Sequence, residues 1–500
     1  MKIKLIIGLA GLLGLISCID SKCPSQDCHA PDCVKQDCGC GSKADTPDIQ
    51  KEVFNAEDIN AADRKAEGSA TPQKCAQSLE PQGILSLKTQ GYAFVDSQGR
   101  RVIFHGINIS GMEWGKTDVF TRKDLHAIAM AGFNAVRFPI GWTGIEPQKD
   151  KIDADYLAGI KQVVNLAEQE GLYVMIDMHQ WLWCTVGMPR WTCLEDPKMD
   201  TAQVMNESRH FFGSKTLKAT LAKRWGLIAG MFADRAVILG YDLFNEPTPV
   251  SVDAALSGAF DLDYLAPFYK EVIAAIRKMD QNHVLILEPN VAAITGNTAI
   301  SRPKDPLIAF SPHYYCPHNY VEGKGLVWLI PPSPDLLRAQ YEEGAKIQKQ
   351  WDCPVLVGEF GMPLDKDEGP EWLDTSLAWQ ENLNFSSFYW DYTGSWGAFD
   401  KETKNIKASY LYHLVRPYPA AVAGHDLHWS SRAWSGWMDM DYQAGSDDLC
   451  KITEVIVPSM LFNNGPEISV DGPVNWRFDK ADHRLLIHAV NIGKIVVKIR

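Results

Sequence analysis

The chain has 500 residues, too many for one ordinary domain, and its hydrophobic share of 46% and charged share of 22% are normal for a globular protein. Its formal net charge of −13 and the lack of a basic stripe argue against a nucleic-acid partner. The sixteen Trp and sixteen Tyr would suit a surface for sugar rings or lipid, although most aromatic residues of any protein lie in its core.

The N-terminus, MKIKLIIGLAGLLGLISC, has the form of an export signal. Two lysines precede an apolar run at 5–16 that is too short to span a bilayer comfortably. Residues 15–18 (LISC) resemble a bacterial lipobox, in which Cys18 is lipidated and becomes a membrane anchor; the alternative is a plain signal peptide with a chance cysteine. We therefore predict a lipoprotein signal peptide at 1–17 and an exported, membrane-anchored protein. Ile19 after the cysteine favours the outer membrane or cell surface.

Residues 18–82 form a predicted Cys-rich and polar tether. Cysteines recur there every five residues, followed by one more: Cys18, Cys23, Cys28, Cys33, Cys38 and Cys40. Few apolar residues separate them, so this segment lacks the means to build a core. It is either a polar spacer, cross-linked by disulfides in an oxidising compartment, or a thiolate metal site. The spacing differs from the C-x2-C pairs of zinc modules, which favours the spacer.

From about residue 83, β-rich runs alternate with stretches of helical periodicity. The predicted strands lie at 101–108, 134–140, 172–179, 236–247, 283–290, 306–315, 353–361 and 385–392. The predicted helices lie at 121–133, 153–171, 217–234, 264–280, 335–351 and 371–383. Between the fifth and sixth strands the connection is brief, so a helix there is short or missing. This alternation predicts an α/β fold, a (β/α)8 TIM barrel over residues 83–418. An open doubly wound sheet is the alternative, but no Gly-rich phosphate loop follows the first strand.

The helical pattern stops after the stretch RPYPAAVAG at 416–424. Short predicted strands with Asn-Gly and Asp-Gly turns follow at 450–459, 467–472, 474–491 and 494–500. Residues 419–500 are therefore predicted to form a small C-terminal β-sandwich. A β unit of this size would gain stability by packing against the barrel.

Polar, ionisable or aromatic side chains end nearly every predicted barrel strand. They are Asn108, Arg137, Trp142, Asp177, His179, Asn245, Glu246, Glu288, His313, Tyr315, Glu359 and Trp390. In this fold the C-terminal ends of the strands form the face that carries the active site. So many such residues at one rim indicate that they line a site.

Glu246 and Glu359 end the fourth and seventh predicted strands, which lie roughly across the barrel mouth from each other. Glycoside hydrolysis needs two carboxyl groups, one protonated to assist the leaving oxygen and one ionised to attack or to activate water, roughly 5 Å apart when a covalent intermediate forms. We expect Arg137 to keep Glu359 ionised, and that anion to raise the pKa of Glu246. The alternative is that either glutamate belongs to a structural ion pair.

Neighbouring residues suit the same chemistry. Tyr315 is placed to hydrogen-bond the nucleophile, Asn245 to reach a sugar 2-hydroxyl, and Trp390 to form a flat floor under the sugar. Further predictions are that Glu288 supports the rim, that Glu146 fixes a loop as a hydrogen-bond acceptor, and that His105 is buried. The nine-residue spacing of Cys184 and Cys193 leaves both a disulfide and free thiols open. A metal site of His179, His313 and His318 is a weak alternative, because their spacing matches no known ligand set.

Five motifs together resemble glycoside hydrolase family 5, in that family's order. They are FNAVRFPIGW, IDMHQ, YDLFNEP, PHYY and VGEFG. The resemblance is greatest to the endoglycoceramidases, which have a similar barrel joined to a C-terminal β-sandwich through a stretch like 416–424, and it covers about residues 83–500. It implies a retaining mechanism with Glu246 as acid/base and Glu359 as nucleophile, and no metal or organic cofactor. The substrate-binding residues that it implies are Arg137, His179, Asn245, His313, Tyr315 and Trp390.

The chain departs from that family where Trp181-Leu182-Trp183 follows His179-Gln180, because the endoglycoceramidases carry an acidic residue there. A second apolar loop, GLVWLIPPSP at 325–334, belongs to the same face. The two loops either pack on each other or receive an apolar ligand. We favour a glycolipid substrate, cut between glycan and ceramide. The alternatives are an endo-β-glucanase or β-glucosidase acting on soluble glycans, and a surface lipoprotein that binds glycans without cleaving them.

Overall fold

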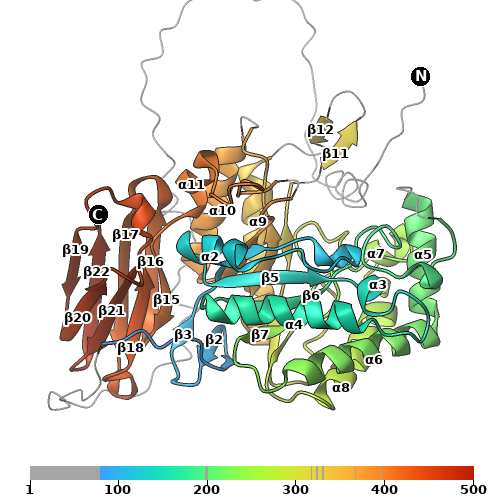
Figure 1. Ribbon diagram of the computed structural model, residues 1–500, viewed down its shortest axis with the longest axis horizontal. Helices are drawn as coiled ribbons and strands as arrows, with labels where there is room; N and C mark the ends of the chain where they lie inside the picture. Colours follow the sequence, from blue (N-terminus) through green and yellow to red (C-terminus); the bar gives the residue numbers. More distant parts are fainter. Residues whose placement is uncertain are drawn as a thin grey trace, which may run out of the picture.

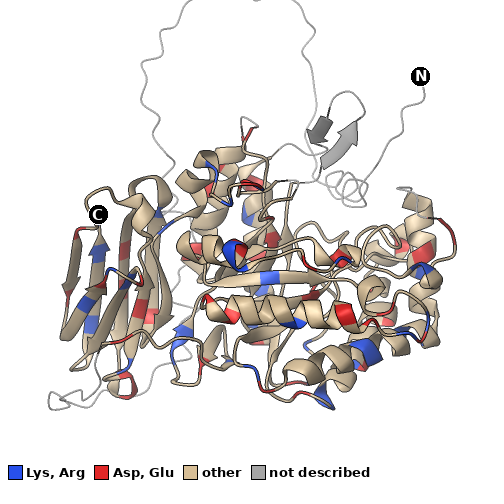
Figure 2. Ribbon diagram, in the orientation of Figure 1, with Lys and Arg blue, Asp and Glu red and all other residues tan. Residues whose placement is uncertain are grey.

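The computed structural model describes residues 79–196, 201–316, 318–321, 325–328, 332–365, 368–394 and 396–500. The predicted signal peptide, the lipidation site Cys18 and nearly all of the tether lie outside these ranges and stay predictions. Within the described ranges, every helix is too short or too polar to cross a membrane. Lys and Arg residues are interspersed with Asp and Glu over both parts of the molecule (Figure 2).

The larger part of the molecule is a parallel barrel (Figure 1). Its strands, in chain order, are β4 (His105–Asn108), β5 (Ala135–Ile140), β6 (Tyr173–Met178), β7 (Ile238–Asp242), β8 (Val284–Leu287), β9 (Ile308–Phe310), β10 (His313–Tyr314), β13 (Leu356–Phe360) and β14 (Ser386–Tyr389). They pair in the order β10-β13-β14-β4-β5-β6-β7-β8-β9. The segments β9 and β10 follow each other directly in the chain, and Phe310 in β9 also bridges in parallel to Val355. The two segments are thus halves of one strand that closes the sheet, which confirms the predicted barrel.

Helices cover the outside of this barrel. They are α2 (Arg122–Met130), α3 (Trp142–Ile145), α4 (Ala154–Gln169), α5 (Thr201–Gly213), α6 (Lys215–Phe232), α7 (Val252–Leu256), α8 (Ala266–Arg277), α9 (Pro334–Trp351), α10 (Gly369–Leu383) and α11 (Ala408–Leu414). Their starts follow local chemistry: Asp153 caps α4 by accepting from the Tyr156 N–H, and Ser333 caps α9 by accepting from the Leu336 N–H. The connection from β8 to β9 contains no helix, as predicted.

The C-terminal part consists of two facing antiparallel sheets. Their strands are β15 (Tyr418–Val422), β16 (His425–Arg432), β17 (Trp437–Ala444), β18 (Ile452–Ile456), β19 (Ile468–Asp471), β20 (Val474–Asp479), β21 (Arg484–Ala489) and β22 (Gly493–Ile499). One sheet has the order β16-β17-β22-β19, and apolar side chains such as Met440, Val455 and Ile487 fill the space between the sheets. This arrangement is the predicted sandwich.

The second sheet of the sandwich also includes strands from the start of the described chain. Its order is β1-β2-β3-β15-β18-β21-β20, where β1 is Leu87–Gln90, β2 is Ala93–Asp96 and β3 is Arg101–Val102. The sequence analysis placed residues 87–102 in the barrel and treated 101–108 as one strand. The strand is instead divided: β3 pairs with β15, and only β4 enters the barrel. The two parts of the molecule are thereby joined through both ends of the barrel segment.

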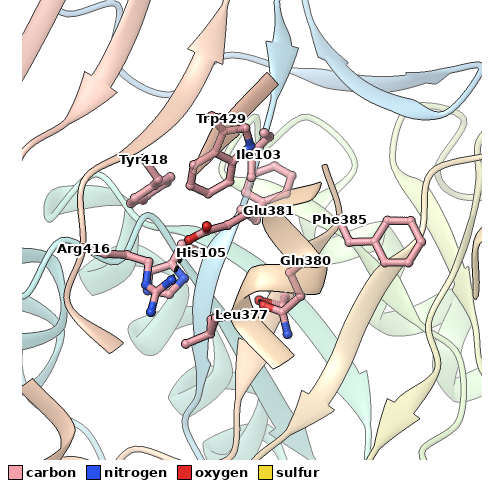
Figure 3. A pocket seen from close by; sticks show the side chains of 11 residues that line it. Ile103, His105, Leu377, Gln380, Glu381, Phe385, Arg416, Tyr418 and Trp429 are labelled. Carbon is pink, nitrogen blue, oxygen red and sulfur yellow. Dashed lines mark hydrogen bonds and ion pairs between the residues drawn. The ribbon is translucent and has the colours of Figure 1, made fainter. Parts of the chain in front are cut away.

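A buried polar contact also joins the barrel to the sandwich. The guanidinium of Arg416 donates to Glu381 in α10 at 2.5 Å, and Glu381 also accepts from the backbone and hydroxyl of Ser431 in β16. Arg416 and Glu381 border a small cavity with His105 and Trp429 (Figure 3). His105 is buried, as predicted; burial and then the charge of Arg416 lower its pKa to about 3, so its ring is neutral.

Two short strands, β11 (His318–Val321) and β12 (Gly325–Trp328), form a hairpin after β10. The apolar segment 325–334 runs through this hairpin and into undescribed residues. Its predicted contact with lipid, and the predicted role of His318, therefore stay predictions.

Candidate active site

Glu246 and Glu359 meet at the C-terminal ends of the barrel strands. Glu246 follows β7, and Glu359 lies in β13. One oxygen of each carboxylate and a ring nitrogen of His313 lie within 4.8 Å of one another. His313 Nδ1 is 3.2 Å from Glu246 Oε1 and 3.6 Å from Glu359 Oε2. This spacing agrees with the roughly 5 Å expected for a covalent sugar intermediate.

The backbone of Glu246 is held in an unusual conformation. Its φ is +44°, in the left-handed region that costs a non-glycine residue energy and that recurs at functional sites. Its N–H donates to Glu288 Oε2 at 2.7 Å, and its carbonyl accepts from the Gln180 amide at 2.9 Å. These two bonds fix the direction of the side chain. Glu288 therefore supports the rim, as predicted.

Glu359 is held by two donors. Arg137 donates to its Oε1 at 2.7 Å, and the Tyr315 hydroxyl donates to its Oε2 at 3.0 Å. The ring of Trp396, from the loop after β14, packs edge-on against Tyr315, with ring centroids 5.5 Å apart. Both carboxylate oxygens of Glu359 thus have a fixed partner, and Tyr315 has the contact that the sequence analysis expected.

Arg137 is the centre of the polar network below these carboxylates. It is fully buried in β5, and its N–H groups donate to five side chains: Asn108, Asp242, Asn245, Glu288 and Glu359. Asn245 also donates to the carbonyl of Gln180 at 2.8 Å. In this unliganded arrangement the amide of Asn245 has a partner at each end, so it orients Arg137 as well as facing the site.

His179 and Trp390 form one wall of the site. Their rings stack with centroids 5.6 Å apart and planes 14° apart. His179 Nδ1 lies 2.7 Å from Asp177 Oδ2, which leaves its Nε2 as the nitrogen free to meet a ligand. Burial lowers the pKa of His179, but the charge of Asp177 and its hydrogen bond outweigh burial, and the pKa is raised.

The predicted order of the two glutamate pKa values is wrong. Burial raises the pKa of Glu359 above its usual value, even though the charges of His313 and Arg137 oppose it. Burial also acts to raise the pKa of Glu246, but the hydrogen bond and charge of His313 outweigh it and lower that pKa. The reason is the position of His313 between the carboxylates. Glu288 and Glu359 overcome the effect of burial on this imidazole and raise its pKa well above the usual range.

Asp391, directly after Trp390, is a buried carboxyl group near the same site. Burial raises its pKa from 3.8 to about 7, with the Gly394 N–H opposing and the charges of Glu113 and Glu359 adding to the shift. In the unfolded chain the group would ionise near its ordinary value. The unfolded state therefore loses its proton first as the pH rises, and Asp391 lowers the free energy of unfolding increasingly between pH 3.8 and about 7.

Asp391→Asn should therefore stabilise the protein at neutral and alkaline pH. The increase in the free energy of unfolding should be near zero at about pH 4. Above about pH 7 it should reach, at most, a few kcal/mol. Denaturant unfolding of both proteins across this range measures it. A gain that is the same at every pH would contradict the stated origin, because over that window the two proteins differ in the ionisation of Asp391 alone.

The loop at 181–194 divides its aromatic residues between core and surface. Cys184 and Cys193 form a disulfide, which closes the loop. Trp183 is buried against Phe211, Phe212 and Phe244. Trp181 and Leu194 are 40% and 48% exposed. Trp183 thus belongs to the core and Trp181 and Leu194 are open to solvent, and the contact of this loop with the second apolar loop or with an apolar ligand stays a prediction.

Glu146 has the structural role predicted for it. It accepts from the Trp142 indole at 2.9 Å, from the Asp150 N–H at 2.6 Å and from Arg224 at 2.7 Å. These contacts fix Glu146 in the loop after β5. Glu146 is therefore not one of the two carboxylates that react with the substrate.

Within the part of the chain that the structure describes, two groups of side chains have the spacing of metal ligands: Glu246, His313 and Glu359, and Asp242, Glu288 and His313. Arg137 forms ion pairs with Asp242 at 2.9 Å, with Glu288 at 3.0 Å and with Glu359 at 2.7 Å. A guanidinium so close repels a divalent cation and already pairs with these carboxylates. The donor set therefore suits acid–base chemistry better than metal binding.

The sequence analysis missed Asp242, Gln180 and Trp396 as parts of the site. Gln180 donates to the carbonyls of both Asn245 and Glu246. A signal for Asp242 was present, because it is an ionisable residue that ends the otherwise uncharged, buried strand ILGYD. Trp396 carried no signal, since its position depends on the path of the loop.

Comparison with known proteins gives two family matches. The family described as cellulase (glycosyl hydrolase family 5) matches residues 95–395, and the glycoside hydrolase family 5 C-terminal domain matches residues 416–499.

Individual relatives fall into two groups. Endoglycoceramidase I of Rhodococcus hoagii is 26% identical over 432 residues, which cover 78% of this chain and 83% of the relative. Endoglucanase A of Ruminococcus albus is 24% identical over 322 residues, 59% of this chain and 81% of the relative. The solved structure of endo-glycoceramidase II from Rhodococcus sp. superposes with a TM-score of 0.69 at 24% identity, over 82% of this chain and 99% of that one.

Proposed function

This chain belongs to glycosyl hydrolase family 5, and on that premise we propose that it is a retaining β-glycosidase that releases the glycan from the ceramide of glycosphingolipids. In this proposal Glu359 is the nucleophile and Glu246 is the acid/base. The observation that carries these roles is the difference in how the two carboxylates are held. Glu359 accepts from Arg137 and Tyr315, whereas the Glu246 carboxylate has, among the described residues, only the His313 ring as a hydrogen-bond partner. Glu246 also has the more exposed side chain, 17% against 6%.

The first step follows from these contacts. Glu359 attacks the anomeric carbon, a C–O bond to the carboxylate forms, and the glycosidic bond breaks as Glu246 protonates the leaving oxygen. Glu246 must receive its proton before this step. His313, with its raised pKa, holds a proton 3.2 Å from Glu246 Oε1 and can pass it across that contact when a glycosidic oxygen approaches.

The second step reverses the roles. Glu246 is now ionised, takes a proton from water, and the water oxygen attacks the anomeric carbon to release Glu359. Arg137 and Tyr315 stabilise the departing carboxylate. The stacked rings of His179 and Trp390 offer a flat wall and one ring nitrogen for the sugar.

The choice of a glycolipid rests on the loop at 181–194 and on the endoglycoceramidase relatives. Exposed Trp181 and Leu194 lie on the loop that follows His179, on the active-site face. An apolar surface there suits the ceramide that leaves on the aglycone side. A lipid anchor at Cys18, as the sequence predicts, would keep the enzyme close to such a substrate.

We expect Trp181→Ala to separate glycolipid from soluble substrate. It should raise KM for a fluorescent glycosphingolipid by roughly tenfold, the cost of losing one buried aromatic contact, and leave hydrolysis of a soluble nitrophenyl glycoside nearly unchanged. Trp434→Ala is the matched control, because Trp434 is 64% exposed and lies in the sandwich. Equal losses on both substrates would reject the lipid role of this loop.

Digestion of a glycolipid tests the substrate itself. Release of an intact glycan and ceramide supports the proposal. The endoglucanase relative favours a second candidate, an endo-β-glucanase or β-glucosidase, and activity confined to cello-oligosaccharides would favour it. Binding without turnover of either substrate would favour a surface lipoprotein that only binds glycans.

A further inference from the structure

The barrel interior below Glu359 holds more carboxylates than its cations can pair. Arg137 forms ion pairs with four of them: Asp177, Asp242, Glu288 and Glu359. All four are buried, and the other cationic groups in contact are the imidazoles His179 and His313. A buried charge without a partner is costly, and the usual outcome is that one group takes up a proton.

Asp242 is the carboxyl group whose surroundings suit a proton. It is completely buried in β7, and its Oδ2 accepts from Arg137 Nε at 2.9 Å. Its Oδ1 has no hydrogen-bond donor among the described residues. An ionised oxygen in this position would lack solvation, whereas a protonated one becomes a donor that needs an acceptor.

An acceptor lies close to this carboxyl group. An oxygen of Asp242, an oxygen of Glu288 and a ring nitrogen of His313 lie within 4.8 Å of one another. Glu288 uses each oxygen once, toward Arg137 and toward the Glu246 N–H, and each carboxylate oxygen has a second lone pair. A proton on Asp242 would thus be shared toward Glu288, which itself orients Glu246.

We propose that Asp242 is a positioning residue that works as a neutral carboxylic acid, holding Arg137 through one oxygen and donating a proton toward Glu288 through the other. In this neutral state Asp242 orients Arg137 through a hydrogen bond but does not neutralise its positive charge. That charge then remains available to pair with Glu359. This inference adds a positioning residue to the proposed function. It rests on the proposed function only where kcat is the measurement.

The charged groups around Asp242 support the same state. They are Arg137 in β5, Asp177 in β6, Glu288 directly after β8 and His313 in β10. Burial and then the charge of Glu288 raise the pKa of Asp242 well above its usual value, although Arg137 opposes them. The anions around Asp242 outweigh the single guanidinium.

A pair of variants at this position tests the proposal by rescue. Asp242→Ala removes the acceptor of Arg137 Nε and should lower kcat by about tenfold or more, because Arg137 then loses part of its fixed geometry. Asp242→Asn keeps an acceptor for Arg137 and replaces the O–H donor by an N–H donor. It should restore kcat to within about threefold of the wild type with the same pH profile, because it removes no charge.

Asp177→Asn is the matched comparison. Asp177 lies in the same interior and pairs with the same guanidinium at 3.1 Å, but it also pairs with His179 at 2.7 Å. Removing this anion should move the pH profile, because its charge raises the pKa of His179. Two results would show that Asp242 acts as an anion and would overturn the proposal. One is that Asp242→Asn shifts the pH profile of kcat as Asp177→Asn does. The other is that Asp242→Asn lowers kcat as much as Asp242→Ala does.

Infrared spectroscopy gives a readout that is independent of activity and of the variants' folding. Wild-type protein labelled with carbon-13 in its aspartate carboxyl groups should show a protonated-acid carbonyl band at about pH 8.5, well above the usual range for Asp. Asp391 ionises at about pH 7, so it should not contribute there. Absence of the band would overturn the proposal whatever substrate the enzyme proves to cleave, and Glu359→Gln would still test the proposed function separately.

Discussion

Glu359→Gln will abolish turnover, with a loss of kcat of roughly 10⁴-fold or more on any substrate that the wild type cleaves. The reason is that the first step requires a covalent bond to a carboxylate, and an amide is a far weaker nucleophile. Arg137 and Tyr315 hold both oxygens of Glu359, so this carboxylate is the one that is fixed for the attack. The variant should remain folded, because the amide still offers Arg137 an acceptor. Steady-state kinetics beside a denaturation curve measure both expectations.

Azide provides the sharper test of the same role. In Glu359→Gly the space of the missing side chain admits a small anion, which can attack the anomeric carbon while Glu246 protonates the leaving group. Activity should return with azide concentration, and the glycosyl azide should have inverted configuration. Without rescue, and with activity surviving in Glu359→Gln, Glu359 would lose its assigned role. Glu288→Gln is the control, because Glu288 is also buried and bonded to Arg137 but faces no substrate; azide should not rescue it.

The sequence was informative where function depends on local pattern. Apolar periodicity predicted the barrel strands, and polar residues at strand ends predicted the rim, because parallel strands with helical crossovers place all their C-terminal ends on one face. Glu246, Glu359, Arg137 and Tyr315 follow from that rule alone, and the structure brings them into contact.

The sequence did not predict features that depend on residues far away in the chain. The strand at 101–108 has one continuous apolar pattern, yet Arg101 and Val102 pair with β15, more than three hundred residues away in the chain. Trp181 and Trp183 are two residues apart and have the same side chain, but the backbone turns between them so that one is buried and the other exposed. A strand's partner and a loop's turn are tertiary properties that composition does not encode.

The order of the glutamate pKa values shows the same limit in electrostatics. Arg137 and Glu359 were considered as a pair, and the expected direction followed from that pair. The structure adds His313 at 3.2 Å from Glu246, and this cation lowers the pKa of Glu246, whereas burial raises the pKa of Glu359. In the proposed mechanism, the His313 imidazole then carries the proton needed for catalysis and contacts Glu246, which delivers that proton to the leaving oxygen.

Glu246→Gln should affect the enzyme in proportion to how much the leaving group needs a proton. Ceramide leaves as an alkoxide unless it is protonated, so hydrolysis of a glycolipid should fall by roughly 10³-fold or more. An activated nitrophenyl glycoside leaves without help, so its first step should proceed at nearly the wild-type rate. The second step still lacks its base. The glycosyl-enzyme should therefore accumulate, visible as a burst of nitrophenol and as a mass increase on the peptide that contains Glu359.

The same variant distinguishes Glu246 from a residue that only supports the fold. Azide needs no general base, so it should release the trapped sugar as a glycosyl azide of retained configuration, opposite to the product expected from Glu359→Gly. The amide of the glutamine can keep its contact with His313, so the neighbouring geometry should survive. If Glu246→Gln slowed both substrates equally and formed no burst, the proton donor would have to be sought elsewhere. His313 would be the first candidate, since it lies within 3.6 Å of Glu359 and carries the proton in the unliganded site.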